Sequence, residues 1–160
     1  MTNFDNREFR NALGTFATGI TVVTTTNDKL EPVGITVNSF TSVSLEPPLI
    51  LWCLDNEADS HGAFSACDNF TVHVLHEGQE VISQIFSSEN NDRFAGLEWE
   101  QGEFGSPVLK DFATCLNCRT EKKYDAGDHI ILLGRVISFE SHQHKKPLIY
   151  HGGAYQHLKS

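Results

Sequence analysis

Basic residues are scarce in this chain, whose 160 residues include 12 Lys and Arg against 21 Asp and Glu, for a formal net charge of −9. An acidic surface repels phosphate backbones, so nucleic acid and anionic membrane surfaces are not expected as partners. No apolar run approaches the roughly 20 residues that a membrane-spanning helix needs, and no signal peptide is recognisable. Residues 1–160 are therefore expected to form one cytoplasmic domain with free thiols.

Several motifs of common enzyme classes are also missing. The sequence has no G-x-G-x-x-G after a strand, no P-loop, no G-x-S-x-G elbow and no H-E-x-x-H, which argues against Rossmann enzymes, P-loop NTPases, serine hydrolases and zinc proteases. Cys115 and Cys118 form a C-x-x-C, but no second close pair supplies the other ligands of a zinc site. Because they lie three apart in an alternating strand pattern, we expect them on opposite faces, as structural cysteines without a metal.

Alternating apolar residues indicate a mainly β protein, an antiparallel barrel or sandwich with peripheral helices. Few helical patterns interrupt these strands, and no repeat is present. The expected helices are 4–16, with Asp5 as N-cap, 60–67, with Ser60 as N-cap, and 78–86. The expected strands are 20–26, 32–38, 49–54, 70–75, 114–124 and 129–141, and short segments at 148–150 and 154–157 close the chain.

A strip of uncharged polar side chains follows the second expected strand. Val33, Ile35 and Val37 alternate with small or polar residues, and hydroxyl side chains continue to Ser44. Such a strip suits a neutral ligand rich in polar atoms, or a phosphate held by hydroxyls and amides. The ordinary alternative is that Thr and Ser are simply common in strands and turns of β proteins.

Two charged or titratable residues outside this strip are candidates for chemistry. His129 follows Asp128 at the mouth of an apolar strand, where it could donate a proton, position a substrate or only stabilise the turn. Arg93, one of few cations, could grip a phosphate at two points or pair with Asp92 or Glu89 in a solvated loop.

Three blocks of sequence carry a family resemblance: FRNALGTFATGITVVTT, GITVNSFTSVSLEPPLILWCL, and YDAGDHIILLGRV followed by PLIYHGGAY. In this order, from about residue 8 to residue 157, the chain resembles the short-chain flavin reductases of the flavin-reductase-like, FMN-binding split-barrel family. The resemblance implies a six-stranded antiparallel split β-barrel, Greek-key-like, that forms a homodimer. It implies reduction of FMN or FAD by NADH or NADPH through hydride transfer to flavin N5, often to supply a separate flavin-dependent monooxygenase.

The resemblance also assigns roles to residues. His129 would lie near the nicotinamide as the catalytic or positioning group, and Tyr150 would help close the pocket. Two acids, Glu57 and Asp59, stand where the family often has basic or hydroxyl residues, which favours a loosely bound, exchangeable flavin. The residues implied in flavin binding are Thr36, Val37, Asn38, Ser39, Phe40, Cys53, Leu54, Asp55, Ser60, His61, Arg93, Phe94 and Tyr155, with Ser60, His61 and Arg93 at the phosphate.

Two other functions stay open at this point. A protein of the same fold could bind flavin or carry electrons without turnover, since fold does not establish activity. The C-x-x-C could alternatively mark a redox or metal module. The choice between FMN and FAD, between NADH and NADPH, and of any partner oxygenase does not follow from the sequence.

Overall fold

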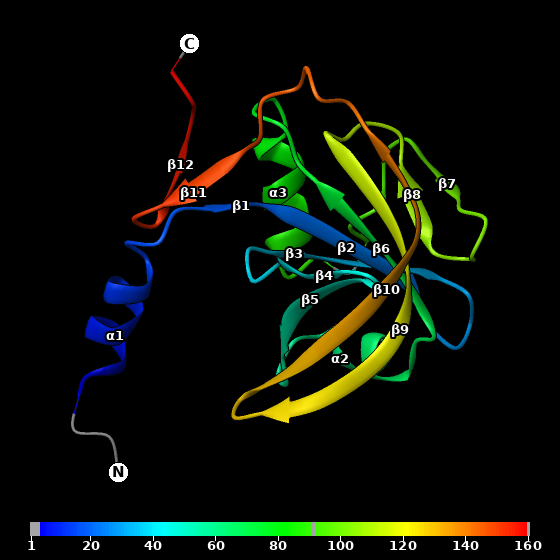
Figure 1. Cartoon of the computed structure of the whole chain (residues 1–160), viewed down its shortest axis with the longest axis horizontal. Helices are drawn as coiled ribbons and strands as arrows, with labels where there is room; N and C mark the ends of the chain where they lie inside the picture. The colour runs from blue at the N-terminus through cyan, green and yellow to red at the C-terminus, as the bar shows by residue number, and fades with distance from the viewer. Residues whose placement is uncertain (1–3, 91, 160) are drawn as a thin grey trace.

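The computed structural model describes residues 4–90 and 92–159, and antiparallel strands dominate them (Figure 1). Three helices accompany the strands: α1 (Asn6–Leu13), α2 (His61–Ala66) and α3 (Glu80–Ser87). The strands are β1 (Thr18–Gly19), β2 (Thr21–Thr26), β3 (Pro32–Val37), β4 (Thr41–Leu45), β5 (Pro48–Asp55), β6 (Asn69–Val74), β7 (Trp99–Gln101), β8 (Pro107–Leu109), β9 (Thr114–Ala126), β10 (His129–Ser141), β11 (Ile149–His151) and β12 (Ala154–Gln156).

The largest sheet has seven strands in the order β3-β2-β6-β9-β10-β5-β4, so the expectation of six strands was wrong. The additional strand is β4, an edge strand within the hydroxyl-rich strip, which was not among the expected strands. No pairing joins the edge strands β3 and β4 in the part of the chain that the structure describes, and the sheet is therefore not closed. The mainly β composition with peripheral helices is confirmed.

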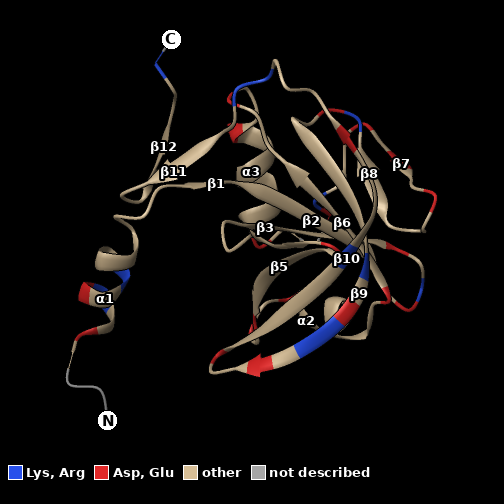
Figure 2. Ribbon diagram, in the orientation of Figure 1, with Lys and Arg blue, Asp and Glu red and all other residues tan. Residues whose placement is uncertain are grey.

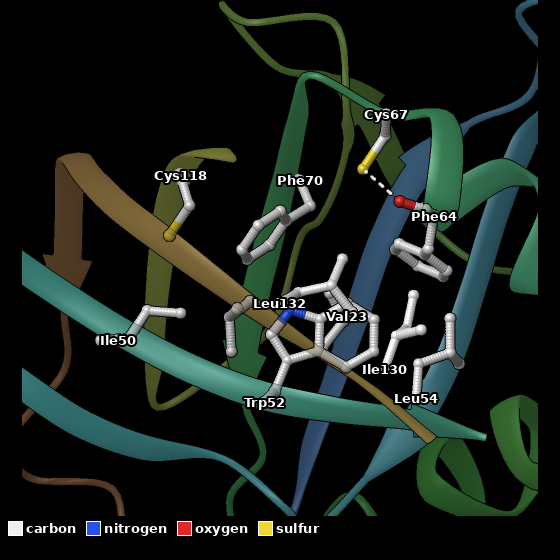
Figure 3. Close-up of a cluster of buried hydrophobic side chains, with 11 residues drawn as sticks. Val23, Ile50, Trp52, Leu54, Phe64, Cys67, Phe70, Cys118, Ile130 and Leu132 are labelled. Carbon is white, nitrogen blue, oxygen red and sulfur yellow. Dashed lines mark hydrogen bonds between the residues drawn. The ribbon is translucent and has the colours of Figure 1, made fainter. Parts of the chain in front are cut away.

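The core of this sheet surrounds Trp52 on its inner face (Figure 3). Trp52 is fully buried and makes edge-on contacts with Phe64 of α2 and Phe70 of β6, at ring-centroid distances of 5.0 and 5.8 Å. A Cβ on Gly134 would lie 2.4 Å from the Phe70 ring, so a glycine is needed where β10 passes this ring. Charged residues gather instead on the turns and along β9 (Figure 2).

Helix α1 begins as expected but buries nothing. The Asp5 carboxylate accepts a hydrogen bond from the Arg7 backbone N–H at 2.9 Å, which confirms the predicted N-cap. The helix ends at Leu13 rather than Phe16, with Gly14 as C-cap. Its apolar side chains remain exposed, and Figure 1 shows the helix standing away from the large sheet. Its apolar stripe therefore has no partner among the described residues.

Helix α2 differs from its prediction at its N-cap. Ser60 occupies the predicted N-cap position, but its side chain makes no capping hydrogen bond. Its Oγ atom is buried without a hydrogen-bond partner among the described residues. An unsatisfied buried hydroxyl costs free energy, which suggests that another molecule supplies the missing partner.

His73 joins three strands as a neutral imidazole. Its side chain is fully buried on β6, with Nδ1 3.1 Å from the Val22 carbonyl oxygen of β2. Nε2 accepts a hydrogen bond from the Leu109 backbone N–H of β8 at 3.1 Å, so Nδ1 carries the proton. Burial lowers the pKa of His73 to about 4, although the bond to Val22 favours the protonated ring.

This burial makes stability pH-dependent. Below pH 6.5 the unfolded chain protonates the imidazole, whereas the folded protein does not until about pH 4. We therefore expect the free energy of unfolding to decrease as the pH is lowered through this interval. This group contributes a limiting decrease of about 3 kcal/mol. Urea unfolding at pH 7 and pH 4.5 measures it. His73→Gln should remove that part of the pH dependence and exposed His144→Gln should retain it; equal slopes in both variants would contradict the assignment.

Candidate functional site

The two faces of β3 have different partners, as the alternation predicted. Val33, Ile35 and Val37 pack against the core around Trp52. On the other face, Gly34 lies against the Phe86 ring of α3, and the Thr36 hydroxyl donates to the Ser83 carbonyl oxygen at 2.7 Å. The polar face of β3 is therefore covered in part by α3.

Two cavities lie where α3 leaves this face open. A cavity of about 190 Å³ lies among Thr36, Val37, Asn38, Tyr150 and Tyr155, with Ile20, Ser83 and Ser87 completing its wall. A second, of about 480 Å³, is lined by Arg10, Asn11, Leu13, Gly14, Phe16, Thr18, Gly152 and Gly153 and shares Asn38 and Tyr150 with the first. The Tyr155 hydroxyl donates to Ser83 Oγ at 3.0 Å, which holds the tyrosine over α3. The structure thus brings Thr36, Val37, Asn38 and Tyr155 together.

Ser39 attaches the end of this strip to β5. Its Oγ accepts from the Cys53 backbone N–H and donates to the Cys53 carbonyl oxygen, both at 2.9 Å. Phe40 packs partly against the core. The Ser39 hydroxyl is therefore used to hold the hydroxyl-rich strip against the backbone of β5. A ligand would contact the surface formed where the strip and β5 meet.

The predicted flavin-binding residues of β5 lie on two different faces of the strand. Leu54 is 1% exposed, with its side chain in the core around Trp52. Cys53 and Asp55 alternate with it and lie on the outer face, where partial burial raises the pKa of the Cys53 thiol. Only the backbone of Leu54 is available to a ligand on the outer face, whereas the side chains of Cys53 and Asp55 are accessible.

Arg93 lies at the other end of the β3 polar face, in a pocket of about 210 Å³ that also contacts Gly34, Asp59, Ser60 and Phe94. Its guanidinium binds both carboxylate oxygens of Asp59, at 3.2 and 2.7 Å. The alternative of a pair with Asp92 or Glu89 is therefore wrong, because Asp59, from the turn after β5, is the partner.

The residues beside this ion pair carry unsatisfied polar atoms. Ser60 is 4% exposed and lines the pocket, and its Oγ has no hydrogen-bond partner among residues 4–90 and 92–159. The same holds for Nε2 of the adjacent His61. Phe94 holds the loop after α3 in place, because its ring packs edge-on against Phe86 of α3 at a centroid distance of 5.0 Å. A buried, unpartnered hydroxyl in the pocket that contains the guanidinium suits an oxygen-rich anion.

His129 begins β10, where it pairs with Asp55 of β5. Its Nδ1 lies 2.7 Å from Asp128 Oδ1, and this hydrogen bond lowers the pKa of the Asp128 carboxyl. The Asn56 backbone N–H donates to the Asp128 carbonyl oxygen at 2.9 Å, which ties the hairpin tip to the turn that carries Asp59. His129 therefore lies beside Asp55, where β5 ends and β10 begins. It does not line any of the three cavities described above.

Cys115 and Cys118 lie on opposite faces of β9, as the strand period predicts. Cys118 packs in the core around Trp52, whereas Cys115 lines a separate surface cavity with Asn117. Burial raises the pKa of each thiol to about 12, so both are neutral at physiological pH. This geometry argues against a shared redox or metal site.

Sequence reasoning missed two residues that build the site. Gly34 allows Phe86 to approach β3, and its carbonyl oxygen accepts from Arg93 Nη1 at 2.9 Å. Asp59 was noted as an unexpected acid but not as the partner of Arg93, which lies 34 residues away. A glycine within a β-branched strand was the one available signal for the close approach.

Comparisons with known proteins agree on one family. The family model described as "Flavin reductase like domain" matches residues 13–159. The chain is 44% identical over 151 residues to "FMN reductase (NADH) SmoA" of Agrobacterium fabrum, covering 94% of this chain and 85% of the relative. It is 39% identical over 151 residues to "Flavin-dependent monooxygenase, reductase subunit HsaB" of Rhodococcus jostii, covering 94% and 77%.

A solved structure shows the same arrangement of the chain. The NADH:FAD oxidoreductase SgcE6 of Streptomyces globisporus C-1027, in complex with NAD and FAD fragments, superposes with a TM-score of 0.92 at 37% identity. The match covers 97% of this chain and 93% of the other.

Gly34 offers a direct test of how the pocket is built. A Cβ at this position would lie 2.5 Å from the Phe86 ring and 3.3 Å from Phe94. We expect Gly34→Ala to lower the free energy of unfolding by about 1–3 kcal/mol, because a packed interior must shift. Gly62→Ala is the matched control: nothing lies within 4 Å of its Cβ, and alanine favours the helix. Urea denaturation compares the two, and a Gly34→Ala protein as stable as the wild type would contradict the close approach.

Proposed function

The chain belongs to the flavin reductase like domain family, and from that membership we propose that it reduces FMN or FAD with NADH or NADPH. The names of the relatives favour NADH, because they read "FMN reductase (NADH)" and "NADH:FAD oxidoreductase". When both nucleotides are bound, hydride passes from C4 of the nicotinamide to N5 of the flavin. The protein then supplies binding and orientation.

The observation that carries this proposal is the unsatisfied Ser60 hydroxyl in the Arg93 pocket, next in sequence to the unsatisfied imidazole of His61. Ser60 Oγ and His61 Nε2 are buried without partners, and Ser60 lines the pocket that contains the guanidinium. A flavin phosphate provides several acceptor oxygens, which can receive hydrogen bonds from a hydroxyl, a ring N–H and an arginine. Ser60, His61 and Arg93 are therefore assigned to the phosphate, with Phe94 holding the loop.

The isoalloxazine ring and ribityl chain are assigned to the surface that joins β3 to β5. Asn38, Ser39 and Phe40 form its turn, and Cys53 and Asp55 continue it on the outer face of β5. Leu54 contributes through its backbone, because its side chain is in the core. Thr36, Val37 and Tyr155 support this surface from the cavity shared with α3.

His129 is assigned to the nicotinamide as a positioning residue. Its Nδ1 is held by Asp128, and its Nε2 has no hydrogen-bond partner among the described residues. A ring with one nitrogen bonded to Asp128 and the other available can orient a bound amide without exchanging a proton. Hydride transfer needs no general base on the protein, which is consistent with this role.

The reduced flavin is proposed to serve a separate flavin-dependent monooxygenase. The support is the relative from Rhodococcus jostii, whose name is that of a monooxygenase reductase subunit. A flavin that must reach another protein has to leave this one, so the site is expected to bind it loosely. A cytosolic location and a single domain over residues 1–160 stay predictions of the same reading.

We propose that the seven-stranded sheet corresponds to the split barrel of the family. We also propose that the chain forms a homodimer through its exposed apolar surface. The apolar residues of the α1 segment are 48–78% exposed, namely Phe4, Phe9, Leu13 and Phe16. An eight-residue helix that buries none of its residues is not stable in water, so α1 needs a partner surface. The large sheet exposes Tyr124, Ile137 and Phe139. A second copy offers both surfaces in a closed two-fold arrangement.

Sedimentation equilibrium tests this assembly. We expect a dimeric mass for the wild type and a shift toward monomer for Phe16→Glu, because a buried charge would oppose association. Leu30→Glu is the control, since Leu30 is 76% exposed, close to the 78% of Phe16, but lies in the β2–β3 turn. A monomeric wild type at micromolar concentration would contradict the dimer.

Steady-state kinetics test the reaction. Purified protein with excess FMN or FAD should oxidise NADH, seen as loss of nicotinamide absorbance. His129→Ala should raise KM for NADH severalfold with a smaller change in kcat, because a positioning contact is lost.

Exposed His144→Ala is the control and should match the wild type. Flavin binding without flavin-dependent NADH or NADPH oxidation would favour the alternative of a non-enzymatic flavin carrier. Unchanged constants in His129→Ala would remove that residue from the site.

A further inference from the structure

All five N–H groups of Arg93 are engaged, but with partners of two kinds. Nε and one Nη2 proton go to the Ser88 carbonyl oxygen, and one Nη1 proton goes to the Gly34 carbonyl oxygen. The remaining two go to the Asp59 carboxylate. Three bonds therefore fix the guanidinium to the backbone of β3 and of the loop after α3, and two hold a side chain.

The two members of this ion pair differ in how firmly they are held. The Arg93 side chain is 12% exposed, whereas that of Asp59 is 55% exposed. Asp59 makes no other side-chain hydrogen bond among the described residues. Its carboxylate can therefore turn into water at little cost, while the guanidinium stays in place.

The Asp59 carboxylate presents two oxygens to an arginine fork, and phosphate binds such a fork in the same way. The surrounding pocket also contains Ser60, 4% exposed, whose Oγ lacks a partner. Asp59 satisfies the guanidinium but leaves this hydroxyl without a bond. The pocket therefore has more donors than the carboxylate uses.

We propose that Asp59 occupies the place of the ligand phosphate on Arg93, and that flavin binding exchanges this carboxylate for the phosphate. This inference rests on the proposed function. Each binding event must break the Arg93–Asp59 pair, and the displaced carboxylate remains nearby as a like charge. Asp59 thus lowers the affinity for phosphorylated flavins and speeds their release, which suits a flavin that passes to another protein.

The test compares FMN with riboflavin, which has the same ring and ribityl chain but no phosphate. Dissociation constants are measured from quenching of flavin fluorescence for the full chain. We expect Asp59→Asn to bind FMN about fivefold more tightly or better, because one competing charge close to the phosphate is removed. Riboflavin affinity should not change, which also reports that the site is folded.

Glu57→Gln is the matched control, because it removes the same charge from the same turn without touching Arg93. It should change FMN affinity by less than twofold. An equal gain in both variants would overturn the exchange in favour of general electrostatics, and so would unchanged or weaker FMN binding in Asp59→Asn. If neither FMN nor riboflavin binds the wild type, the proposed function itself fails.

Discussion

The candidate site depends on the hydrogen bonds and the ion pair that the Arg93 guanidinium makes. The guanidinium joins the Gly34 backbone of β3, the Ser88 backbone after α3 and the Asp59 carboxylate after β5. Three segments far apart in the chain are thereby held at one end of the β3 polar face. Because its five donors point in fixed directions, the arginine determines the shape of the pocket as well as its charge. A lysine could hold only part of this arrangement.

The polar face of β3 shows how one strand serves both the core and the site. Its apolar side chains complete the packing around Trp52, and its opposite face must accept α3 at close range. Gly34 and Thr36 satisfy that requirement, one by lacking a side chain and the other by bonding Ser83. The part of this face that α3 leaves uncovered lines a cavity. Core packing therefore decides which polar groups remain available to a ligand.

Much of the fold follows from local pattern. The predicted strand 129–141 matches β10, and Asp5 caps α1 as its residue type indicates. Strand β4 was missed because it lies at a sheet edge with its apolar residues Val43 and Leu45 exposed. Its sequence therefore lacks the buried apolar residues that would indicate a strand. Helix α1 was predicted too long because its apolar stripe continues to Phe16, beyond the last helical residue. Periodicity reports which face is apolar, and not what covers it.

The sequence by itself determined the β-rich class, the opposite faces of β3 and of the C-x-x-C, and, through family resemblance, the flavin chemistry. These depend on strand period and on motifs, which are local. Only the tertiary structure decided that Arg93 pairs with Asp59, that the Leu54 side chain enters the core, and that Ser60 Oγ is left without a partner. Contacts across 34 residues depend on how the strands pair and where α3 packs, and no local pattern encodes that geometry.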